Sequence, residues 1–349
     1  MRIALDATYS VGDGLTGVGV YSREILHGLA RAHPESEFVF CYRPHRFRAA
    51  LREPVPPNVR RRPLFNALPT RAALFHALNQ RVDTGRFPRV VSTFHDLFVL
   101  TAEYSTPGFR ARFAEQARGA AARSDLIVAV SEFTARQVEH LLGVPRARIR
   151  VIHHGVHLPA AVPPPDSGRE NLILHVGAIQ TRKNIVRLVQ ALEAAPIGWR
   201  LALAGSAGYG AAEILLAIER SPRRSNIDVL GYVSDAALGS LYQRARIFAF
   251  PSLDEGFGMP VLDAMANGIP VITSNSSALP EVAGGAAWLV DPRRAADIAN
   301  ALARLTADPA LRGELRGKGL ARAEAFTWGE AVSRTWAVYK ELLGREQLG

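Results

Sequence analysis

Short hydrophobic runs alternate along this chain with longer amphipathic stretches of helical period. The runs are continuous and rich in Val, Ile and Leu, a pattern typical of parallel strands that are buried on both faces. The stretches between them are long enough to form the helices that connect such strands. The predicted strands comprise residues 2–6, 37–42, 89–93, 125–130, 148–152, 171–176, 199–204, 227–230, 247–250, 270–273 and 286–290.

This alternation predicts an α/β fold with two doubly wound, Rossmann-like domains, because 349 residues exceed what one hydrophobic core usually serves. A proline-rich stretch without periodicity, residues 159–168, indicates the boundary, so we place one domain at residues 1–165 and the next at 166–330. Just before it, we interpret His153-His154-Gly155 as a hinge turn in which Gly155 absorbs the change in dihedral angles. Ligands are expected in the cleft between the domains, beyond the carboxyl ends of the strands.

Composition narrows the class of protein. Hydrophobic residues make up 48% of the chain, which is typical of a soluble globular protein, and no run approaches the roughly 20 residues of a membrane-spanning helix. Asp6 interrupts the first hydrophobic run too early for a signal peptide. Cys41 is the single cysteine, which leaves no internal disulfide and no cysteine cluster for a metal. We therefore expect a cytoplasmic protein without a bound metal.

Positive charge is concentrated in the first half of the chain. Residues 1–165 contain 22 arginines and 13 acidic residues, a net charge of +9, against +1 for the remainder. We favour an anionic membrane surface as the partner, at the inner face of the plasma membrane, over nucleic acid, for which the chain has no known binding signature. The alternative is that arginine simply covers the surface of this protein. The arginine clusters are Arg43/Arg46/Arg48, Arg60-Arg61-Arg62 and Arg81/Arg86/Arg89.

The most informative segment is Glu255-Gly-Phe-Gly-Met-Pro-Val-Leu-Asp263, which follows the predicted strand 247–250. Pro260 suits the start of a helix, so Asp263 is predicted in the first helical turn. A glycine-containing loop that leads into a helix is an anion site, whereas carboxylates beside it suit hydroxyl groups. Glu255 as an acceptor for a sugar and Asp263 as an acceptor for a ribose would bracket a phosphate, which describes a nucleotide-sugar. The alternative is an acidic loop before an ordinary helix.

Cations for that phosphate are expected after the first strand of the second domain. Arg182 and Lys183 follow the predicted strand 171–176 and precede a helix. Lys183 is one of three lysines in a chain with 39 arginines, so a lysine stands where arginine is usual. A compact ammonium beside a planar guanidinium suits a diphosphate. Cations at a helix N-terminus oppose the helix dipole unless an anion is present, which disfavours a pair that merely faces solvent.

The first domain contributes a glycine pair and a histidine. Gly17 and Gly19 precede a helix predicted over residues 21–31 and allow backbone N–H groups to approach a ligand, although the third glycine of a dinucleotide fingerprint is missing. His95 stands at the carboxyl end of a predicted strand, where it would contact a sugar hydroxyl while Asp96 fixes its tautomer. A purely structural histidine is the alternative.

Together these segments resemble glycosyltransferase family 4, retaining enzymes of the GT-B fold. Glu255–Asp263 resembles the family's Glu-x7-Glu signature, and the other motifs occur in the family's order over nearly the whole chain. The resemblance is greatest to bacterial mannosyltransferases that build O-antigen and exopolysaccharide chains. The other similar segments are Gly17-Val-Gly19, Thr93-Phe-His-Asp-Leu97, Val130-Ser-Glu-Phe133, Thr181-Arg-Lys-Asn184, Phe250-Pro-Ser252, residues 264–272, residues 274–282 and Phe326-Thr-Trp328.

The resemblance implies roles for these residues. Glu255 would accept hydrogen bonds from the donor sugar, Asp263 would hold the ribose, and His95 would touch the sugar near its 6-hydroxyl. Arg182 and Lys183 would neutralise the diphosphate leaving group, a role that metals fill in other glycosyltransferases. Backbone contacts are implied for Gly17, Gly19, Phe257, Gly258 and Met259 with the phosphates and sugar, and around Val233 with the base.

Two positions depart from the family's pattern. Asp263 is one methylene shorter than the second glutamate of the signature, so its ribose contact would be longer or shifted. Ala178 stands where many relatives carry arginine, and Arg182 is expected to supply that charge instead. The resemblance also implies that the helix within residues 331–349 crosses back onto the first domain.

The implied reaction is transfer of a hexose with retention and without a metal, and no Asp-x-Asp pair, the usual metal-binding motif of the other major glycosyltransferase fold, occurs in the chain. GDP-mannose is the favoured donor, with GDP-rhamnose, GDP-fucose and UDP-glucose left open. A glycan, lipid-linked, is the expected acceptor. A nucleotide-sugar epimerase of the same architecture is an alternative, although no base pairs with the glycine loops. A nucleic-acid-binding or scaffold protein is another.

Overall fold

The computed structural model describes residues 1–12, 14–64, 72–82, 87–161 and 163–344, and the chain divides into two compact units. The first unit comprises Met1–Gly155 and Thr327–Gly349, and the second comprises Val156–Phe326. The boundary thus falls after Gly155 rather than at residue 165. Val156 belongs to the second unit, where its N–H donates a hydrogen bond to the carbonyl of Phe326. The last helix belongs to the first unit.

A parallel sheet of seven strands forms the described core of the first unit, in the order β3-β2-β1-β4-β5-β6-β7. The strands are β1 (Arg2–Asp6), β2 (Glu37–Tyr42), β3 (Val59–Pro63), β4 (Leu74–Ala77), β5 (Val90–Phe94), β6 (Leu126–Ala129) and β7 (Ile149–Val151). The helices described with them are α1 (Gly17–Ala32), α2 (Pro44–Ala50), α3 (Phe98–Thr101), α4 (Pro107–Arg123), α5 (Glu132–Leu142) and α13 (Trp328–Leu343).

The second unit is built in the same way around a parallel sheet of six described strands, in the order β10-β9-β8-β11-β12-β13. The strands are β8 (Leu172–Val176), β9 (Arg200–Ala204), β10 (Ile227–Gly231), β11 (Ile247–Phe250), β12 (Val271–Ser274) and β13 (Trp288–Val290). Its helices are α6 (Ile185–Ala191), α7 (Ala211–Glu219), α8 (Asp235–Arg244), α9 (Met259–Ala266), α10 (Leu279–Ala283), α11 (Ala295–Ala307) and α12 (Pro309–Glu324).

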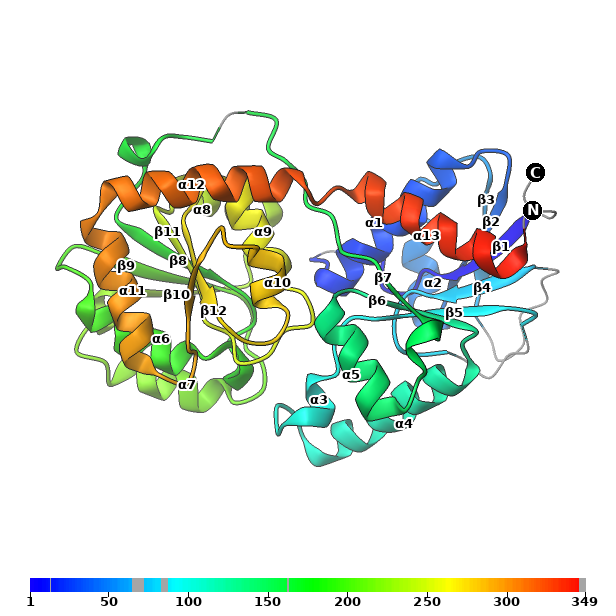
Figure 1. The fold of residues 1–349 in the computed structure, drawn as a ribbon, viewed down its shortest axis with the longest axis horizontal. Helices are drawn as coiled ribbons and strands as arrows, with labels where there is room; N and C mark the ends of the chain where they lie inside the picture. The colour runs from blue at the N-terminus through cyan, green and yellow to red at the C-terminus, as the bar shows by residue number, and fades with distance from the viewer. Residues whose placement is uncertain (13, 65–71, 83–86, 162, 345–349) are drawn as a thin grey trace. The chain divides into compact units, whose positions relative to one another are not determined.

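The prediction of two doubly wound, Rossmann-like units is confirmed, and Figure 1 shows helices covering both sheets. All eleven predicted strands are present, with ends displaced by at most two residues. Two strands were not predicted. β3 has the sequence Val-Arg-Arg-Arg-Pro and lies at the sheet edge, where charged residues and proline are tolerated. β4 is only four residues long and carries His76 among its buried positions, so it resembles no long hydrophobic run.

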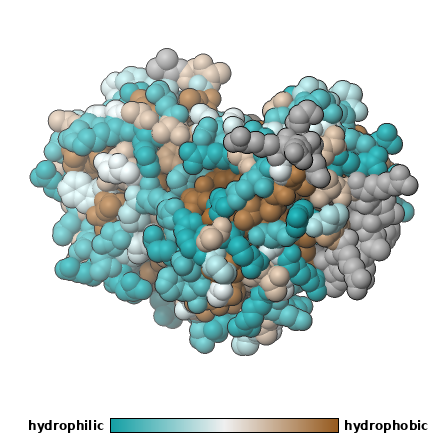
Figure 2. Space-filling view, turned by 45° about the vertical axis from the view of Figure 1, so that its right-hand side comes forward, coloured by the Kyte–Doolittle hydropathy of each residue, from teal (hydrophilic) through white to brown (hydrophobic). Residues whose placement is uncertain are grey.

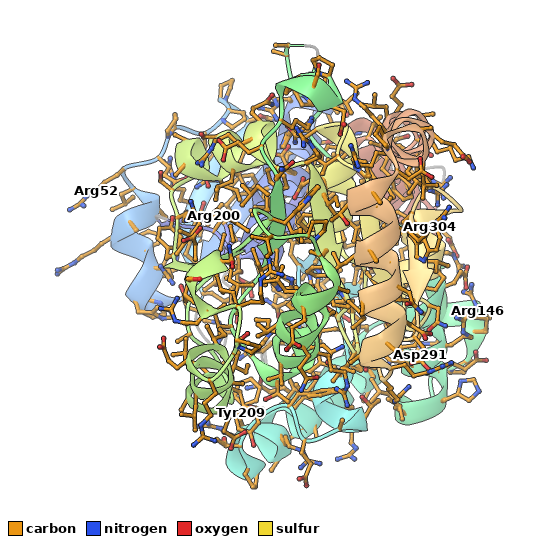
Figure 3. The ribbon with its side chains drawn as sticks, turned by 90° about the vertical axis from the view of Figure 1, so that its left-hand side faces the viewer. Arg52, Arg146, Arg200, Tyr209, Asp291 and Arg304 are labelled. Atoms are coloured by element: carbon orange, nitrogen blue, oxygen red, sulfur yellow. The ribbon has the colours of Figure 1, made fainter. Side chains whose placement is uncertain are left out.

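The arginine cluster at residues 60–62 is therefore an edge strand with alternating exposure. Arg60 and Arg62 are exposed, and Arg60 Nε lies 2.8 Å from Glu37 Oε1 on the neighbouring strand. Figure 3 shows the side chain of Arg52, another arginine of the first unit, extending away from the ribbon. The side of the molecule in Figure 2 is largely hydrophilic.

Among the described helices, none is both long and apolar enough to cross a membrane. Arg86 of the third predicted cluster lies outside the described residues.

The glycine pair near the N-terminus lies in a helix, not in a loop before one. α1 begins at Gly17, four residues earlier than predicted, with Thr16 as its N-cap. A Cβ placed on Gly19 would lie 2.8 Å from the Tyr9 carbonyl oxygen. Gly19 is therefore needed because the first turn of α1 packs directly against the chain that follows β1.

Gly155, interpreted above as a hinge glycine, is also needed for close packing. A Cβ on Gly155 would lie 2.3 Å from the backbone nitrogen of Trp328, and its φ is not in the left-handed region. The preceding His154 is buried with its ring centroid 4.8 Å from that of Tyr21. Gly155 is nevertheless the last residue before the chain enters the second unit, so its role as a hinge stays a prediction.

The C-terminal helix is an integral part of the first unit. α13 lies against α1, where a Cβ on Gly28 would lie 2.4 Å from Val332 Cγ2 (Figure 1). On its buried side, a hydrogen bond of 2.6 Å joins Tyr339 Oη to His76 Nδ1, and one of 2.9 Å joins His76 Nε2 to Thr93 Oγ1. A polar chain thus links α13 to the central strands β4 and β5.

Candidate active site

The strand order of the second sheet reverses between β8 and β11. Ligands of doubly wound sheets bind beyond the carboxyl ends of the strands at such a reversal. Arg182 and Lys183 follow β8, and Glu255 follows β11. The two loops that flank the reversal therefore carry three of the residues predicted to act on the donor.

These three side chains form one buried charge cluster. Lys183 Nζ donates to Glu255 Oε1 at 2.6 Å, and Arg182 Nη1 lies 2.8 Å from Glu255 Oε2. All three residues are about 8% exposed. The Lys183 ammonium also lies 4.5 Å from the ring centroid of Phe250, a cation–π contact. Because two cations share one carboxylate, the cluster carries one net positive charge and is suited to an anionic ligand.

The ionisation of Glu255 depends on these partners. Burial alone raises the pKa of its carboxyl group, but Arg182 and Lys183 more than offset burial and hold that pKa at about 2. Glu255 is therefore ionised at neutral pH. Removal of either partner from such a buried pair leaves a poorly compensated charge.

The backbone around the cations is held in place by residues on both sides. Gly177 adopts a φ of +153°, and a Cβ there would lie 3.2 Å from Lys183 Cε, so the glycine leaves room for the lysine stem. Thr181–Lys183 form a 3-10 turn that ends at Asn184, which has a φ of 60°. The Leu253 N–H donates to the Arg182 carbonyl at 2.8 Å, which ties this turn to the loop after β11.

Asn184 connects three loops of the second unit. Its Nδ2 donates to the carbonyls of Pro251, after β11, at 2.9 Å and of Pro292, after β13, at 2.7 Å. No role was predicted for it from the sequence. The sequence signal that could have identified it is an asparagine directly after the cation pair. Asparagine tolerates the left-handed conformation better than most residues, so it is suited to a tight turn at this position.

The loop after Glu255 leads into α9 through a glycine with a positive φ. Gly258 has a φ of 110°, and a Cβ there would lie 2.7 Å from Leu279 Cδ2, so only glycine fits. Phe257 is buried, with its ring centroid 6.0 Å from that of Phe326, and Met259 is the first residue of α9. The predicted loop and helix N-terminus are thus present at the carboxyl end of β11.

Asp263 lies one turn further along α9 than predicted. The helix begins at Met259, so Asp263 is its fifth residue and the first turn contains no acidic side chain. Burial raises the pKa of the half-buried Asp263 carboxyl to about 7, with His157 opposing the change. The group is therefore partly protonated at neutral pH and can both donate and accept hydrogen bonds, as ribose hydroxyls do.

Val233 lies on the same carboxyl edge of the second sheet, but away from the charge cluster. It is half-buried in the turn between β10 and α8, and β9 separates β10 from β8. Gly231, two residues earlier, has a φ of 64°, and its carbonyl accepts from the Gly205 N–H at 2.8 Å. The turn is thus tied to the neighbouring loop after β9.

Gly17, Gly19 and His95 belong to the first unit. His95 is 7% exposed, and its ring centroid lies 4.8 Å from that of Tyr21 and 5.4 Å from that of His154. Burial lowers the pKa of His95 to about 4, so its ring is neutral at pH 7. Its Nε2 lies 2.9 Å from the Leu78 carbonyl oxygen. This main-chain carbonyl therefore takes part in fixing the tautomer of His95, which could not be predicted from the sequence.

Comparison with known proteins identifies the family of the chain. Residues 163–321 match the family model described as Glycosyl transferases group 1, and residues 15–159 match the model described as Glycosyltransferase Family 4. The chain is 33% identical over 272 residues to the O-antigen chain mannosyltransferase B of Escherichia coli, which covers 74% of this chain and 71% of that protein. It is 28% identical over 279 residues to the serotype-specific mannosyltransferase WbdA of Escherichia coli, covering 74% of this chain but only 34% of WbdA.

A solved structure shares the whole architecture. The sucrose-phosphate synthase of Thermosynechococcus elongatus superposes with a TM-score of 0.78 at 22% identity, covering 98% of this chain and 99% of that one. At this identity the likeness shows the fold alone. Together with the family models and the mannosyltransferase relatives, it confirms the family that the motifs indicated: the chain belongs to glycosyltransferase family 4 and is a glycosyltransferase of the GT-B fold.

Proposed function

We propose that this glycosyltransferase moves mannose from GDP-mannose to a hydroxyl of a lipid-linked glycan in cell-surface polysaccharide synthesis. The observation that carries the proposal is the buried cluster of Arg182, Lys183 and Glu255 at the reversal of the second sheet. The choice of mannose is supported by the relatives, which are named as mannosyltransferases of O-antigen chains and serotypes.

In this proposal the cations act on the leaving group. Arg182 and Lys183 neutralise the charge that develops on the diphosphate, and electrostatic stabilisation of this kind usually contributes more to the rate than any other effect. Glu255 keeps both ion pairs and still accepts a sugar hydroxyl, because each carboxylate oxygen has more than one acceptor site. Asp263 holds the ribose. The remaining contacts stay predictions: the backbone of Gly17, Gly19, Phe257, Gly258, Met259 and Val233, and the side chain of His95.

The proposed transfer retains the configuration of the sugar and needs no metal. The bond between the anomeric carbon and the phosphate oxygen breaks, and the acceptor oxygen bonds to the same face of that carbon through an oxocarbenium-like state. The acceptor's proton passes to the departing phosphate oxygen, so GDP is released as the glycosidic bond forms. The charge that a metal would neutralise is assigned to Arg182 and Lys183.

A panel of nucleotide-sugars tests this function directly. GDP-mannose is expected to raise the melting temperature more than GDP-rhamnose, GDP-fucose or UDP-glucose, because a ligand that binds only the folded state stabilises it. With a mannoside acceptor, NMR of the product is expected to show an α linkage, at a rate that EDTA leaves unchanged. A β-linked product, or a loss of rate in EDTA, contradicts the proposed mechanism. Conversion of the nucleotide-sugar into its epimer, without release of nucleotide when acceptor is added, favours the epimerase instead.

We also propose that the arginine-rich first unit contacts anionic lipid. Its net charge supports this contact, since each basic residue near such a surface contributes about 1 kcal/mol of attraction. Co-sedimentation with vesicles containing phosphatidylglycerol is expected at ~150 mM salt, whereas binding of duplex DNA is expected to be lost there. Equal recovery with neutral phosphatidylcholine vesicles contradicts the proposed charge recognition.

A further inference from the structure

The two central strands of the second sheet separate at their carboxyl ends. The paired positions of β8 and β11 end at Leu174 and Phe248. On its other side each strand stays paired further along the chain, β8 with β9 as far as Val176 and β11 with β12 as far as Phe250. The sheet therefore opens along the reversal of its strand order, directly before the two loops that carry the charge cluster.

The side chain of His175 bridges this opening. His175 is completely buried on β8, and its Nδ1 lies 2.9 Å from the carbonyl oxygen of Ala249 on β11, the residue that would face it if the pairing continued. A carbonyl can only accept a hydrogen bond, so Nδ1 carries the proton. Burial lowers the pKa of His175 to about 4, so the ring is neutral at pH 7 and its Nε2 is an unprotonated acceptor.

This second ring nitrogen is buried without a hydrogen-bond partner among the described residues. Most buried polar atoms in proteins are paired, and a phenylalanine would fill similar space without an unpaired nitrogen. Histidine is therefore not the residue that favours stability most at this position. A residue that breaks a rule of this kind in the core is expected where function requires it.

The ring of His175 also contacts the side chain that supports the lysine of the charge cluster. It stacks on Phe250, with ring centroids 5.5 Å apart and ring planes inclined by 21°. The Lys183 ammonium lies 4.5 Å from the centroid of the same Phe250 ring. His175 thus acts on Lys183 in two ways. Its bond to Ala249 fixes the separation of the two strands, and its ring supports the aromatic ring that the ammonium contacts.

We propose that His175 is a positioning residue of the transfer reaction, which joins β8 to β11 across their opening and so places the Lys183 ammonium for the diphosphate. The inference rests on the proposed function, because it concerns the leaving group of that reaction. A phenylalanine at this position keeps an aromatic ring but releases the Ala249 carbonyl, so the strands and the ammonium can shift. A misplacement of about 1 Å can lower an enzymatic rate by about 10²-fold.

The test compares the same substitution in two buried histidines. With GDP-mannose as donor and α-mannobiose as acceptor, His175→Phe is expected to lower kcat at least about 10-fold. The KM for GDP-mannose is expected to change less than about threefold, because the cation acts on charge that develops during the reaction. The Tm is expected to stay within about 2 °C of wild type, since the unpaired nitrogen is lost together with the bond.

His76→Phe in the first unit is the matched control with the opposite expectation. Both ring nitrogens of His76 are paired, with Tyr339 and with Thr93, so this substitution breaks two buried hydrogen bonds. It is expected to lower the Tm by about 5 °C and to leave kcat within about twofold of wild type.

His175→Asn is the rescue variant. Its Nδ2 can take the place of the histidine Nδ1 and donate to Ala249, so kcat is expected to return to within about threefold of wild type. A spectroscopic measurement needs no donor at all. NMR of the wild-type protein with nitrogen-15 in its histidines is expected to show an Nδ1–H tautomer that is absent from the spectrum of His175→Phe.

Each contrary result has a distinct meaning. If His175→Phe keeps the wild-type kcat, or if it loses kcat and Tm together and His175→Asn restores neither, His175 is only a structural residue and the inference is wrong. An Nε2–H tautomer of His175 also contradicts the inference, because the bridge to Ala249 would be missing. Should His175→Phe fail to fold, His175→Gln replaces it. Its amide lies at the place of Nε2 rather than of Nδ1, so the same loss of kcat is expected.

Failure of the proposed function gives a different result. If the wild type turns over another nucleotide-sugar of the panel but not GDP-mannose, only the proposed donor is wrong, and the same variants are compared with the donor that is used. If the wild type transfers no sugar, the proposed function fails as a whole. The tautomer of His175 then still decides whether the bridge between β8 and β11 exists.

Discussion

Substitution of Lys183 by alanine is expected to lower kcat for mannose transfer by at least about 10²-fold, by analogy with the loss of one oxyanion donor. The ammonium lies 2.6 Å from Glu255 in a buried site, so its charge is fixed in position before the leaving group develops its own. Water can replace the ammonium only if its molecules reorient during the reaction. In the variant, Arg182 is the single cation left in the cluster. Steady-state kinetics with saturating GDP-mannose measure the effect.

Lys318 supplies the matched control. It is another of the three lysines, exposed on α12, and it pairs with Glu314 at 2.6 Å one helical turn away. An exposed pair of this kind contributes little, so Lys318→Ala is expected to retain wild-type rate and melting temperature. A folded Lys183→Ala protein that turns over near the wild-type rate would remove Lys183 from the proposed chemistry.

Stability is expected to fall steeply in acid because of buried neutral histidines in the first unit. Burial lowers the pKa of His76 to about 3 and that of His95 to about 4, while the unfolded chain binds the same protons near pH 6.5. Below pH 6.5 the unfolded state therefore holds more protons, and the stability present above that pH is lost as pH falls toward the folded pKa values. Between pH 7 and pH 4 each histidine is expected to remove about 3 kcal/mol from the free energy of unfolding.

Urea unfolding at a series of pH values, followed by tryptophan fluorescence, measures this loss. His76→Asn removes the titrating ring but keeps an oxygen that can bond to Tyr339, so the dependence on pH is expected to become shallower even if stability at pH 7 drops. His140→Gln changes an exposed histidine of the same unit and is expected to leave the dependence unaltered. Identical pH profiles for wild type and His76→Asn would show that acid acts elsewhere.

Candidate site residues were predictable where they directly follow a recognisable strand. Arg182, Lys183 and Glu255 all do so. Charged side chains just beyond the carboxyl end of a buried strand indicate a ligand site even before the structure is known. β4 could not be recognised in this way, because it is only four residues long and includes a histidine. The role of Asn184 was also hidden, since it consists of bonds to carbonyls more than 60 residues away.

The sequence by itself determined the alternation of strands and helices, the two-unit organisation and the family. It could do so because burial of a parallel strand on both faces leaves a local hydrophobic pattern, and because motifs occur in a set order. Only the tertiary structure decided the start of α1, the place of Gly155 against Trp328, and the pairing of Glu255 with Lys183, 72 residues earlier. These features depend on contacts between distant segments, and a local pattern records that a residue is buried but not which residue it meets.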